Sequence, residues 1–381
     1  MTVRSFAVVV ASTALLVGCT GGGADTLASS GASPSAPSST ASPPETVPFA
    51  PGDITVDAKG HVYASDCGGG YVFRVSPTGS VTVVAGIGIS SFAGGLSGDG
   101  GPATKAQLAC PAGLVFDGDG DLLVADHANN RIRSIDTEGI IETVAGNGPL
   151  GTAAEGGDLT GDGGPALEAT LQEPVGIAFD ADGALLVADR DHHAIRSIAP
   201  DGTITTIAGT GEQSYSGDGG PAEDATFVSP VYVVPDASGN LYVADDEAGV
   251  IRRIDTSGTI TTFAGTGEIG YSGDGGPAIE ATFGAPEGLA FDEAGNLFVA
   301  DLDNHVIRMI DRGGIVQTVF GPGEPGCPSG DPDVDPRAAP LSDPSGLVFD
   351  EAGNLFVADG TCGVIRIGRD GALVVLAPAV F

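Results

Sequence analysis

The stretch Pro286-Glu-Gly-Leu-Ala-Phe-Asp292, followed by Glu-Ala-Gly-Asn296 and Leu297-Phe-Val-Ala-Asp301, decides the fold. Its apolar runs are short, rich in Leu, Val and Phe, and bounded by Gly, Asn and Asp. Runs of that kind between turn residues indicate β-strands rather than helices. The Asp-x-x-Gly between two of the runs is typical of a tight hairpin, because Gly and Asn adopt positive φ at little cost.

The same pattern returns six times along the 381 residues, as an Asp, a second Asp nine residues later, and then an Arg after seven or eight more. The first Asp is Asp57, Asp117, Asp180, Asp236, Asp292 and Asp350. The second is Asp66, Asp126, Asp189, Asp245, Asp301 and Asp359, and the Arg is Arg74, Arg133, Arg196, Arg252, Arg308 and Arg366. A period of 56 to 63 residues predicts a closed or stacked repeat architecture. Four antiparallel strands in each repeat predict an all-β, six-bladed β-propeller with the first strand of each blade innermost.

The phrases GNLFVADLDNHVIR (295–308) and GNLFVADGTCGVIR (353–366) resemble the NHL repeat family. Four links between repeats carry Ser/Thr-Gly-Asp-Gly-Gly-Pro-Ala, as in 272–278, which is similar to bacterial and teneurin-type members. The resemblance covers about residues 51–377 and implies six blades with one repeat per blade. No terminal strand is evident that would complete a shared blade, so the mode of ring closure stays open.

The amino terminus predicts export. Residues 1–18 contain Arg4 and an apolar stretch and indicate a signal peptide. The ending Leu-Val-Gly-Cys19 resembles the lipobox of bacterial lipoproteins, which implies that Cys19 carries acyl groups such as palmitate. Residues 19–48, rich in Ser, Pro and Ala, predict a disordered tether, and residues 49–381 form the propeller. We expect a monomeric lipoprotein at the cell surface or the outer face of the cytoplasmic membrane, anchored by its lipid.

The net charge of the chain limits the classes of binding partner that the sequence predicts. The chain has 15 Lys and Arg against 50 Asp and Glu, which gives a formal net charge of −35. Nucleic-acid binding needs clustered Lys and Arg, so we expect none. A protein or an envelope or cell-wall ligand is the expected partner.

Four further cysteines in an exported chain predict disulfides. Strand alternation places Cys67 and Cys362 in turns, on the same rim as the links that hold Cys110 and Cys327. This topology favours the pairs Cys67–Cys110 and Cys327–Cys362. The alternative pair Cys67–Cys362, which would bridge the junction between the last and first blades, remains open.

No constellation in the sequence predicts catalysis. The inner strands, taken as 54–56, 114–116, 177–179, 231–234, 289–291 and 347–349, carry no His or Glu. The repeated Asp and Arg are interpreted as pairs that hold the blades, although a ring of carboxylates could bind Ca²⁺. Asp117-Gly-Asp-Gly-Asp121 is interpreted as an ordinary turn, because it lacks the downstream Glu of a calcium loop.

Two groups of residues suggest a binding rim on the side of the links. Asp126, His127, Asp189, Asp191 and His192 are candidates for a small polar site, and Tyr215 and Tyr271 are aromatic contact residues in the links. We therefore hypothesise a binding, sensory or protein-interaction module without catalytic or metal residues. The alternatives are a Ca²⁺- or Zn²⁺-dependent hydrolase or lyase and a purely scaffolding wall protein.

Overall fold

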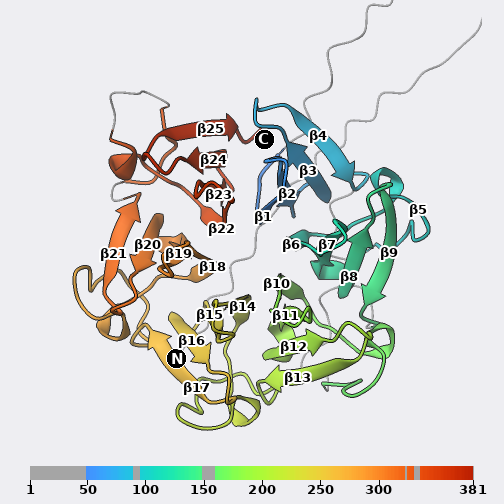
Figure 1. Ribbon diagram of the computed structural model, residues 1–381, viewed down its shortest axis with the longest axis horizontal. Helices are drawn as coiled ribbons and strands as arrows, with labels where there is room; N and C mark the ends of the chain where they lie inside the picture. The colour runs from blue at the N-terminus through green and yellow to red at the C-terminus, as the bar shows by residue number, and fades with distance from the viewer. Residues whose placement is uncertain (1–48, 89–94, 148–158, 322–323, 330–334, 381) are drawn as a thin grey trace, which may run out of the picture. The chain divides into compact units, whose positions relative to one another are not determined.

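The computed structural model describes residues 49–88, 95–147, 159–321, 324–329 and 335–380 (Figure 1). Its strands form six separate antiparallel sheets around a central axis, which confirms the predicted six-bladed propeller. Five sheets have four strands, and the sheet of blade 2 has a fifth, contributed by the preceding link. Arg4, Cys19 and the predicted tether lie outside the described residues. Within them, no helix has the length and apolarity needed to cross a bilayer.

The blades follow one another along the chain. Blade 1 comprises β1 (Ile54–Val56), β2 (Val62–Asp66), β3 (Tyr71–Val75) and β4 (Val81–Ala85). Blade 2 comprises β5 (Gly101–Pro102), β6 (Pro111–Phe116), β7 (Leu122–Asp126), β8 (Arg131–Ile135) and β9 (Ile140–Ala145). Blade 3 comprises β10 (Pro174–Phe179), β11 (Leu185–Asp189), β12 (Ala194–Ile198) and β13 (Ile204–Ala208).

Blades 4 to 6 repeat this order. Blade 4 comprises β14 (Pro230–Pro235), β15 (Leu241–Asp245), β16 (Val250–Ile254) and β17 (Ile260–Ala264). Blade 5 comprises β18 (Pro286–Phe291), β19 (Leu297–Asp301), β20 (Val306–Ile310) and β21 (Val316–Phe320). Blade 6 comprises β22 (Pro344–Phe349), β23 (Leu355–Asp359), β24 (Gly363–Ile367) and β25 (Leu373–Ala377). The one-turn 3-10 helices are η1 (Ala103–Lys105), η2 (His127–Asn129), η3 (Ala166–Glu168), η4 (Arg190–His192), η5 (Ala222–Asp224), η6 (Ala278–Glu280), η7 (Leu302–Asn304) and η8 (Pro336–Ala338).

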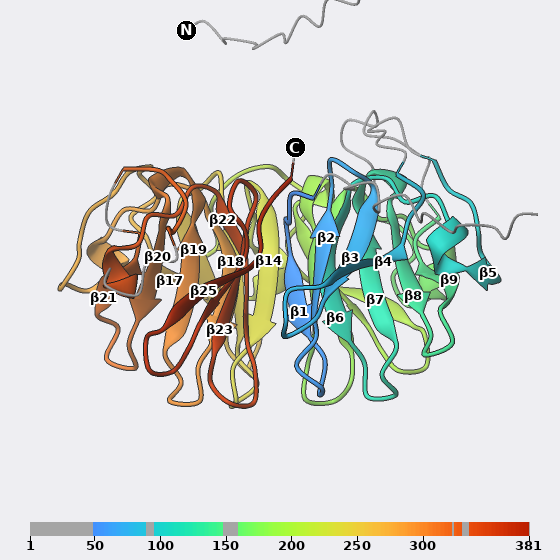
Figure 2. The same ribbon diagram turned by 90° about the horizontal axis from the view of Figure 1, so that it is seen from above.

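The first Asp of each repeat closes the turn between the first and second strands. Asp236 Oδ1 accepts the backbone N–H groups of Ser238 at 2.8 Å and of Asn240 at 2.9 Å. Asp117 Oδ1 accepts those of Asp119 and Asp121 in the same way, each at 2.9 Å. Such side-chain bonds to the backbone stabilise turns, and they account for the Asp-rich stretch at 117–121. These turns define one rim of the disc, here called the hairpin rim (Figure 2).

The opposite rim, here called the link-side rim, holds the links between blades and the turns between second and third strands. The links before blades 2 to 5 pack beside the outermost strand of the blade that follows: Pro277, for example, forms a bridge with Ile315, ahead of the single turn η6. Covering an outer strand in this way removes an open sheet edge. Phe227 and Phe283, which come from two of these links, are completely buried between blades.

The ring closes without sharing a blade between the two ends of the chain. Blades 1 and 6 are each built from contiguous sequence, and Phe49 pairs with Val380 through two backbone hydrogen bonds of 2.7 and 3.0 Å. The Phe49 ring packs edge-on against Phe73 at 4.9 Å. The disulfides are Cys67–Cys110 and Cys327–Cys362, which confirms the favoured connectivity. They lie in the blades on either side of this junction.

Candidate functional site

In blades 2 to 5 a buried Arg joins the third strand to the preceding link. In blade 3, Arg196 donates to Asp189 Oδ2 at 3.2 Å and to Asp162 Oδ1, in the Thr-Gly-Asp link, at 2.7 Å. It also donates to the Thr170 carbonyl at 3.2 Å, while Asp189 Oδ1 accepts the N–H of Gln172. Because charge-assisted bonds converge on one guanidinium, each such Arg acts as a clamp between link and blade. The other clamps are Arg133 with Asp99, Arg252 with Asp218, and Arg308 with Asp274.

Arg74 and Arg366 do not belong to this set, which corrects the equivalence drawn from sequence spacing. Arg133 pairs across the sheet with Val124, whereas Arg74 pairs with Tyr63 and Arg366 with Phe356, one position further along. The buried position is taken by Phe73 in blade 1 and Ile365 in blade 6. A one-residue difference in turn length or spacing changes the strand face on which a side chain lies, so a fixed count from the second Asp misassigns both residues.

The residues predicted to form one binding rim do not lie together in the structure. Asp126 and Asp189 are fully buried in the clamps, and the His192 ring is buried with Nδ1 2.8 Å from Asp189 Oδ2. These three side chains serve the blade interior, so we leave them out of the candidate site. Tyr215 and Tyr271 are 40% and 50% exposed.

The two tyrosines lie at the outer part of the disc. The Tyr215 hydroxyl bonds Thr262 on the outermost strand of blade 4, and Tyr271 bonds Thr318 of blade 5 at 2.8 Å. Their rings cover Arg252 and Arg308 at 4.9 and 5.4 Å. They therefore shield the clamps and do not meet the polar residues of the channel.

The inner strands of the six blades differ at one position in the channel. Four residues before the first Asp, four blades have glycine, and each inner strand approaches its neighbour closely there. A Cβ on Gly288 would lie 2.0 Å from the Ser345 carbonyl oxygen, and one on Gly113 would lie 2.2 Å from that of Val175. Blades 1 and 4 have Asp53 and Tyr232 at this position instead.

Asp53 and Tyr232 meet across the channel. The Tyr232 hydroxyl donates to Asp53 Oδ1 at 2.9 Å, and the backbone N–H of Leu114 donates to Asp53 Oδ2 at 2.8 Å. One carboxylate thus joins blades 1, 2 and 4. Burial raises the pKa of Asp53 to about 6, and the N–H groups of Ile54 and Leu114 and the Tyr232 hydroxyl limit the rise.

Beside this pair lies Glu287, a carboxylate without a hydrogen-bond partner among the described residues. It belongs to β18, because the inner strand begins at Pro286 and not at Leu289. The prediction that the inner strands carry no Glu is therefore wrong. Burial raises the pKa of Glu287 to about 7, and the charges of Asp246, Asp53 and Asp303 raise it further. Burial also raises the pKa of Asp246.

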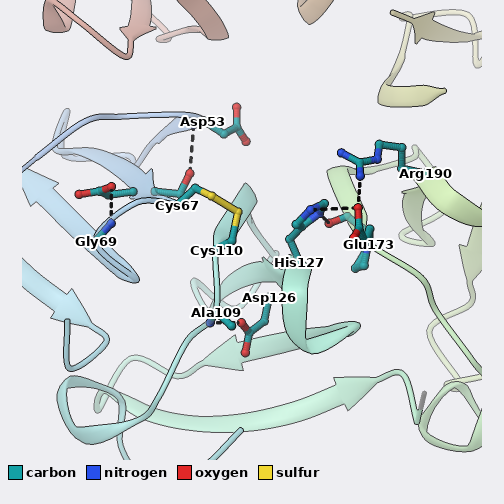
Figure 3. The surroundings of a disulfide bond; sticks show 12 residues. Asp53, Cys67, Gly69, Ala109, Cys110, Asp126, His127, Glu173 and Arg190 are labelled. Atoms are coloured by element: carbon teal, nitrogen blue, oxygen red, sulfur yellow. Dashed lines mark hydrogen bonds and ion pairs between the residues drawn. A yellow bond between two sulfur atoms is a disulfide. The ribbon is translucent and has the colours of Figure 1, made fainter. Parts of the chain in front are cut away.

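A second group of polar residues lies at the link-side rim, next to the ends of β7 and β11 (Figure 3). Arg190 pairs with Glu173 and, through Nε, with Asp191 at 2.9 Å. His127 Nε2 lies 3.4 Å from Glu173 Oε2, and Nδ1 lies 3.3 Å from the Pro174 carbonyl oxygen. Burial and Arg190 lower the pKa of His127 to about 4, so the neutral ring has one N–H for two acceptors.

Glu173 holds this group together in a strained conformation. Its φ of 49° is in the left-handed region, which costs a residue other than Gly on the order of 1 kcal/mol or more. The Asn130 side chain accepts its backbone N–H at 2.8 Å and fixes it there. Of the predicted rim, His127 and Asp191 are therefore part of the channel mouth.

We call the Asp53–Tyr232 pair, together with the polar residues on its link side, the mouth cluster. It comprises Asp53, His127, Glu173, Arg190, Asp191, Tyr232, Asp246 and Glu287. Among the described residues, no three His, Cys, Asp or Glu side chains converge as metal ligands. The arrangement offers carboxylates and one hydroxyl to a ligand with a positively charged group. Aligning the six repeats residue by residue would have singled out Asp53, Tyr232 and Glu287, because each replaces a small or apolar residue.

Comparison with known proteins places the chain among NHL propellers. The family model described as teneurin NHL domain matches residues 74–155, 155–215 and 267–325, about half of the chain. Teneurin-4 of Mus musculus is 32% identical over 284 residues, which cover 66% of this chain and 10% of that protein. Protein SUPPRESSOR OF QUENCHING 1, chloroplastic, of Arabidopsis thaliana is 28% identical over 270 residues, with 67% and 24% covered. The chain thus spans a quarter or less of the length of these relatives.

The fold also resembles solved propellers. A catalytically inactive virginiamycin B lyase from Staphylococcus aureus with quinupristin has a TM-score of 0.51 and 17% sequence identity. The superposition covers 87% of this chain and 85% of the lyase. At this identity the likeness concerns the fold alone.

Proposed function

Because the chain belongs to the teneurin NHL domain family, we propose that its propeller is a binding module that takes a ligand at the mouth cluster. The ligand is a protein or an envelope polymer that presents an ammonium or guanidinium group. In this proposal the module is exported, and acyl groups on Cys19 anchor it to the membrane. The lipobox-like sequence before Cys19 and the Ser/Pro/Ala-rich residues 19–48 support this placement.

The unpaired carboxylate of Glu287 carries the proposal. Glu287 is partly buried and has no hydrogen-bond or ion-pair partner among the described residues. A charge withdrawn from water without a partner costs stability, and an apolar residue would avoid this cost. The same position in blades 2, 3 and 4 holds Ala112, Val175 and Val231. Residues that reduce stability without serving the fold are typical of functional sites. A cation bound between Glu287, Asp246 and Asp53 would remove the repulsion that raises the pKa of Glu287.

The site also limits how a ligand enters. The hydrogen bond from Tyr232 to Asp53 crosses the channel at its centre. Glu287 precedes Gly288, the residue level with this bond, and so lies on its link side. A ligand therefore approaches from the link-side rim, and its charged group reaches Glu287 before it reaches Asp53.

A catalytic role for the same site is the second candidate. A carboxyl group whose pKa is near 7 is suited to general acid–base catalysis. The single observation that favours it is the raised pKa of Glu287. A screen of the full chain against lactones, esters and lyase substrates would test it, with Glu287→Gln as the variant expected to lose activity.

The binding proposal is tested with two matched variants. Glu287→Gln removes the charge at the mouth, and Glu293→Gln removes one from an exposed pair with Arg369. The full chain is immobilised and exposed to an envelope fraction, and the retained species are identified by mass spectrometry. We expect a species that wild type and Glu293→Gln retain and that Glu287→Gln loses at least tenfold. Equal retention by all three proteins would reject the mouth cluster as the binding site.

The anchor is tested separately. We expect Cys19→Ala to move the chain from the membrane fraction to the soluble fraction and to abolish acyl groups detected by mass spectrometry. An unchanged membrane fraction would contradict the lipid anchor without bearing on the mouth cluster.

A further inference from the structure

A cleft on the opposite rim of the disc stands apart from the mouth cluster. It lies between blades 1 and 2 at the hairpin rim and has a volume of about 820 Å³. The corresponding cleft between blades 4 and 5 measures about 340 Å³. A volume of several hundred Å³ is typical of sites for small organic ligands.

One of the side-chain differences between the two clefts lies in the apolar floor. Between blades 4 and 5, Tyr242 packs against Phe263 at 4.9 Å and against Phe291 at 5.0 Å. Between blades 1 and 2, Tyr63 packs in the same way against Phe116 at 4.9 Å. The place of Phe263 is taken by Val84, since both residues occupy the irregular step between third and fourth strands. The smaller side chain leaves an open apolar floor.

The blade 1 wall of the cleft carries positive charge that no carboxylate pairs with among the described residues. Arg253, the counterpart of Arg74 in blade 4, donates to Asn240 at 2.9 Å. In blade 1 His61 replaces this Asn and turns to Asp57, with Nδ1 2.9 Å from Oδ2. Within the described residues, neither Arg74 nor Lys59 forms an ion pair, and both line the cleft. The Arg74 guanidinium interacts with the Tyr63 hydroxyl but has no carboxylate partner there. Such a guanidinium beside a Lys favours an anionic group such as a carboxylate.

The blade 2 wall carries the opposite charge. Asp119 and Glu138 line the cleft there, and neither side chain forms an ion pair within the described part of the chain. Burial and the charges of Asp117, Asp136 and Asp119 raise the pKa of the adjacent Asp121, so this wall has an excess of negative charge. An ammonium group would neutralise it.

We propose that this cleft binds a short zwitterionic peptide with apolar side chains. Its terminal carboxylate pairs with Arg74 and Lys59, and its terminal ammonium lies toward Asp119 and Glu138. The side chains cover the floor formed by Tyr63, Phe116 and Val84. A peptide suits the site better than a single amino acid, because opposite charges stand on separate walls with an apolar floor between them. Carboxylate and amine together give the site its selectivity, since a ligand lacking either leaves one wall unneutralised.

The experiment compares three forms of one probe by isothermal titration calorimetry with the full chain. The probes are the dipeptide Phe-Leu, its N-acetyl form, which lacks the ammonium, and its C-terminal amide, which lacks the carboxylate. We expect wild type to bind the free dipeptide at least tenfold more tightly than either blocked form. No binding of the free dipeptide, or equal binding of the three probes, would overturn the proposal.

Variants locate the site. Arg74→Gln should weaken binding of the free dipeptide at least tenfold, and Arg253→Gln, the matched change in blade 4, should leave it unchanged. Val84→Phe should abolish binding by restoring the aromatic filling seen between blades 4 and 5. Thermal melting verifies that each variant is folded. If Val84→Phe does not fold, Arg74→Gln still tests the proposal. Equal affinities of Arg74→Gln and Arg253→Gln would contradict the assignment. Glu287→Gln should bind the dipeptide as wild type does, which separates this cleft from the mouth cluster.

Discussion

Blades 2 to 5 hold their link-side ends with buried Arg clamps, whereas blades 1 and 6 hold theirs with disulfides. Arg252 in blade 4 reaches Asp218 in the preceding link at 2.7 Å and the carbonyl oxygen of Thr226 at 3.2 Å. Phe73 of blade 1 and Ile365 of blade 6 occupy the same position without charge. Cys67–Cys110 and Cys327–Cys362 join these two blades to their neighbouring links.

The difference follows from the link. The Ser-Gly-Asp-Gly-Gly-Pro-Ala phrase does not occur in the sequence given before blade 1, and the link before blade 6 departs from it, with its Asp331 outside the described residues. An Arg buried without its carboxylate would be an uncompensated charge, and an apolar residue avoids that cost. The repeat therefore changes its means of attachment where the link phrase is absent or diverges in sequence. The clamp and the disulfide serve the same purpose by different chemistry.

The strongest test removes a clamp. Arg252→Met leaves Asp218 and two carbonyl oxygens without their donor, and we expect a loss of about 3–5 kcal/mol in the free energy of unfolding. Denaturant unfolding of the full chain measures it. Arg366→Met, at the same sequence distance from its Asp but outside the clamp position, should cost about 1 kcal/mol or less. Equal losses would show that the clamp is not what distinguishes the two sets of blades.

The second test breaks the other kind of attachment. The double variant Cys67→Ala, Cys110→Ala removes the cross-link between two positions that are 43 residues apart in sequence. We expect a loss of about 2–4 kcal/mol, the usual effect of removing a native disulfide. The measurement is denaturant unfolding with and without a reducing agent. Reductant should lower the stability of wild type more than that of the double variant. Wild type loses two disulfides on reduction, whereas the double variant has only Cys327–Cys362 to lose. A wild type insensitive to reductant would contradict a stabilising role.

The third test concerns the contact that joins blades across the channel. Tyr232→Phe removes the hydroxyl that donates to Asp53 at 2.9 Å and keeps the ring. We expect a loss of about 1–2 kcal/mol in unfolding free energy, the usual cost of losing a partner of a buried polar group. Tyr242→Phe serves as a control, because its hydroxyl lies 3.5 Å from Asp236 at the hairpin rim. An effect of Tyr232→Phe no larger than that of Tyr242→Phe would show that the bond does not hold the ring.

The smallest effect belongs to a surface pair. Arg369 and Glu293 lie 3.3 Å apart, with side chains 71% and 65% exposed. Arg369→Gln should change the free energy of unfolding by less than about 0.5 kcal/mol, because solvent and salt screen such pairs. Denaturant unfolding at low and high salt measures the change. A loss of stability comparable to that of Arg252→Met would show that burial does not explain why the clamps contribute strongly to stability.

The sequence was sufficient for the architecture. Short apolar runs, Asp-x-x-Gly turns and a fixed period predicted six four-stranded blades, and the alternation of strands placed the four cysteines on one rim. Both kinds of inference rest on local signals that repeat. The β5 strand of blade 2 escaped prediction, because Gly101 and Pro102 have low strand propensity and pair only through the position of their link.

The candidate site was harder to predict, because it depends on contacts between blades. Asp53 and Tyr232 are 179 residues apart in sequence, and only closure of the ring brings them together. Asp126, Asp189 and His192 were expected on the surface and are buried in the interior. Glu287 was missed because the inner strand was taken to begin at its first apolar run, three residues late at Leu289.

The central claim is that Glu287 serves a ligand and not the fold, and the pH dependence of stability tests it. Burial raises the pKa of folded Glu287 from 4.5 to about 7. Its protonation therefore favours the folded state, and this contribution is complete below about pH 4.5 and lost as the pH rises toward 7. Other buried carboxylates, such as Asp53, contribute in the same direction, so wild type and Glu287→Gln are compared directly.

The measurement is the melting temperature of both proteins between pH 5 and pH 8 without ligand. We expect Glu287→Gln to melt higher than wild type at pH 8, with a gap that narrows toward pH 5, since the amide carries no charge at any pH. A variant that melts lower than wild type at pH 8 would show that the ionised Glu287 stabilises the propeller, and this would contradict its assignment to the binding site.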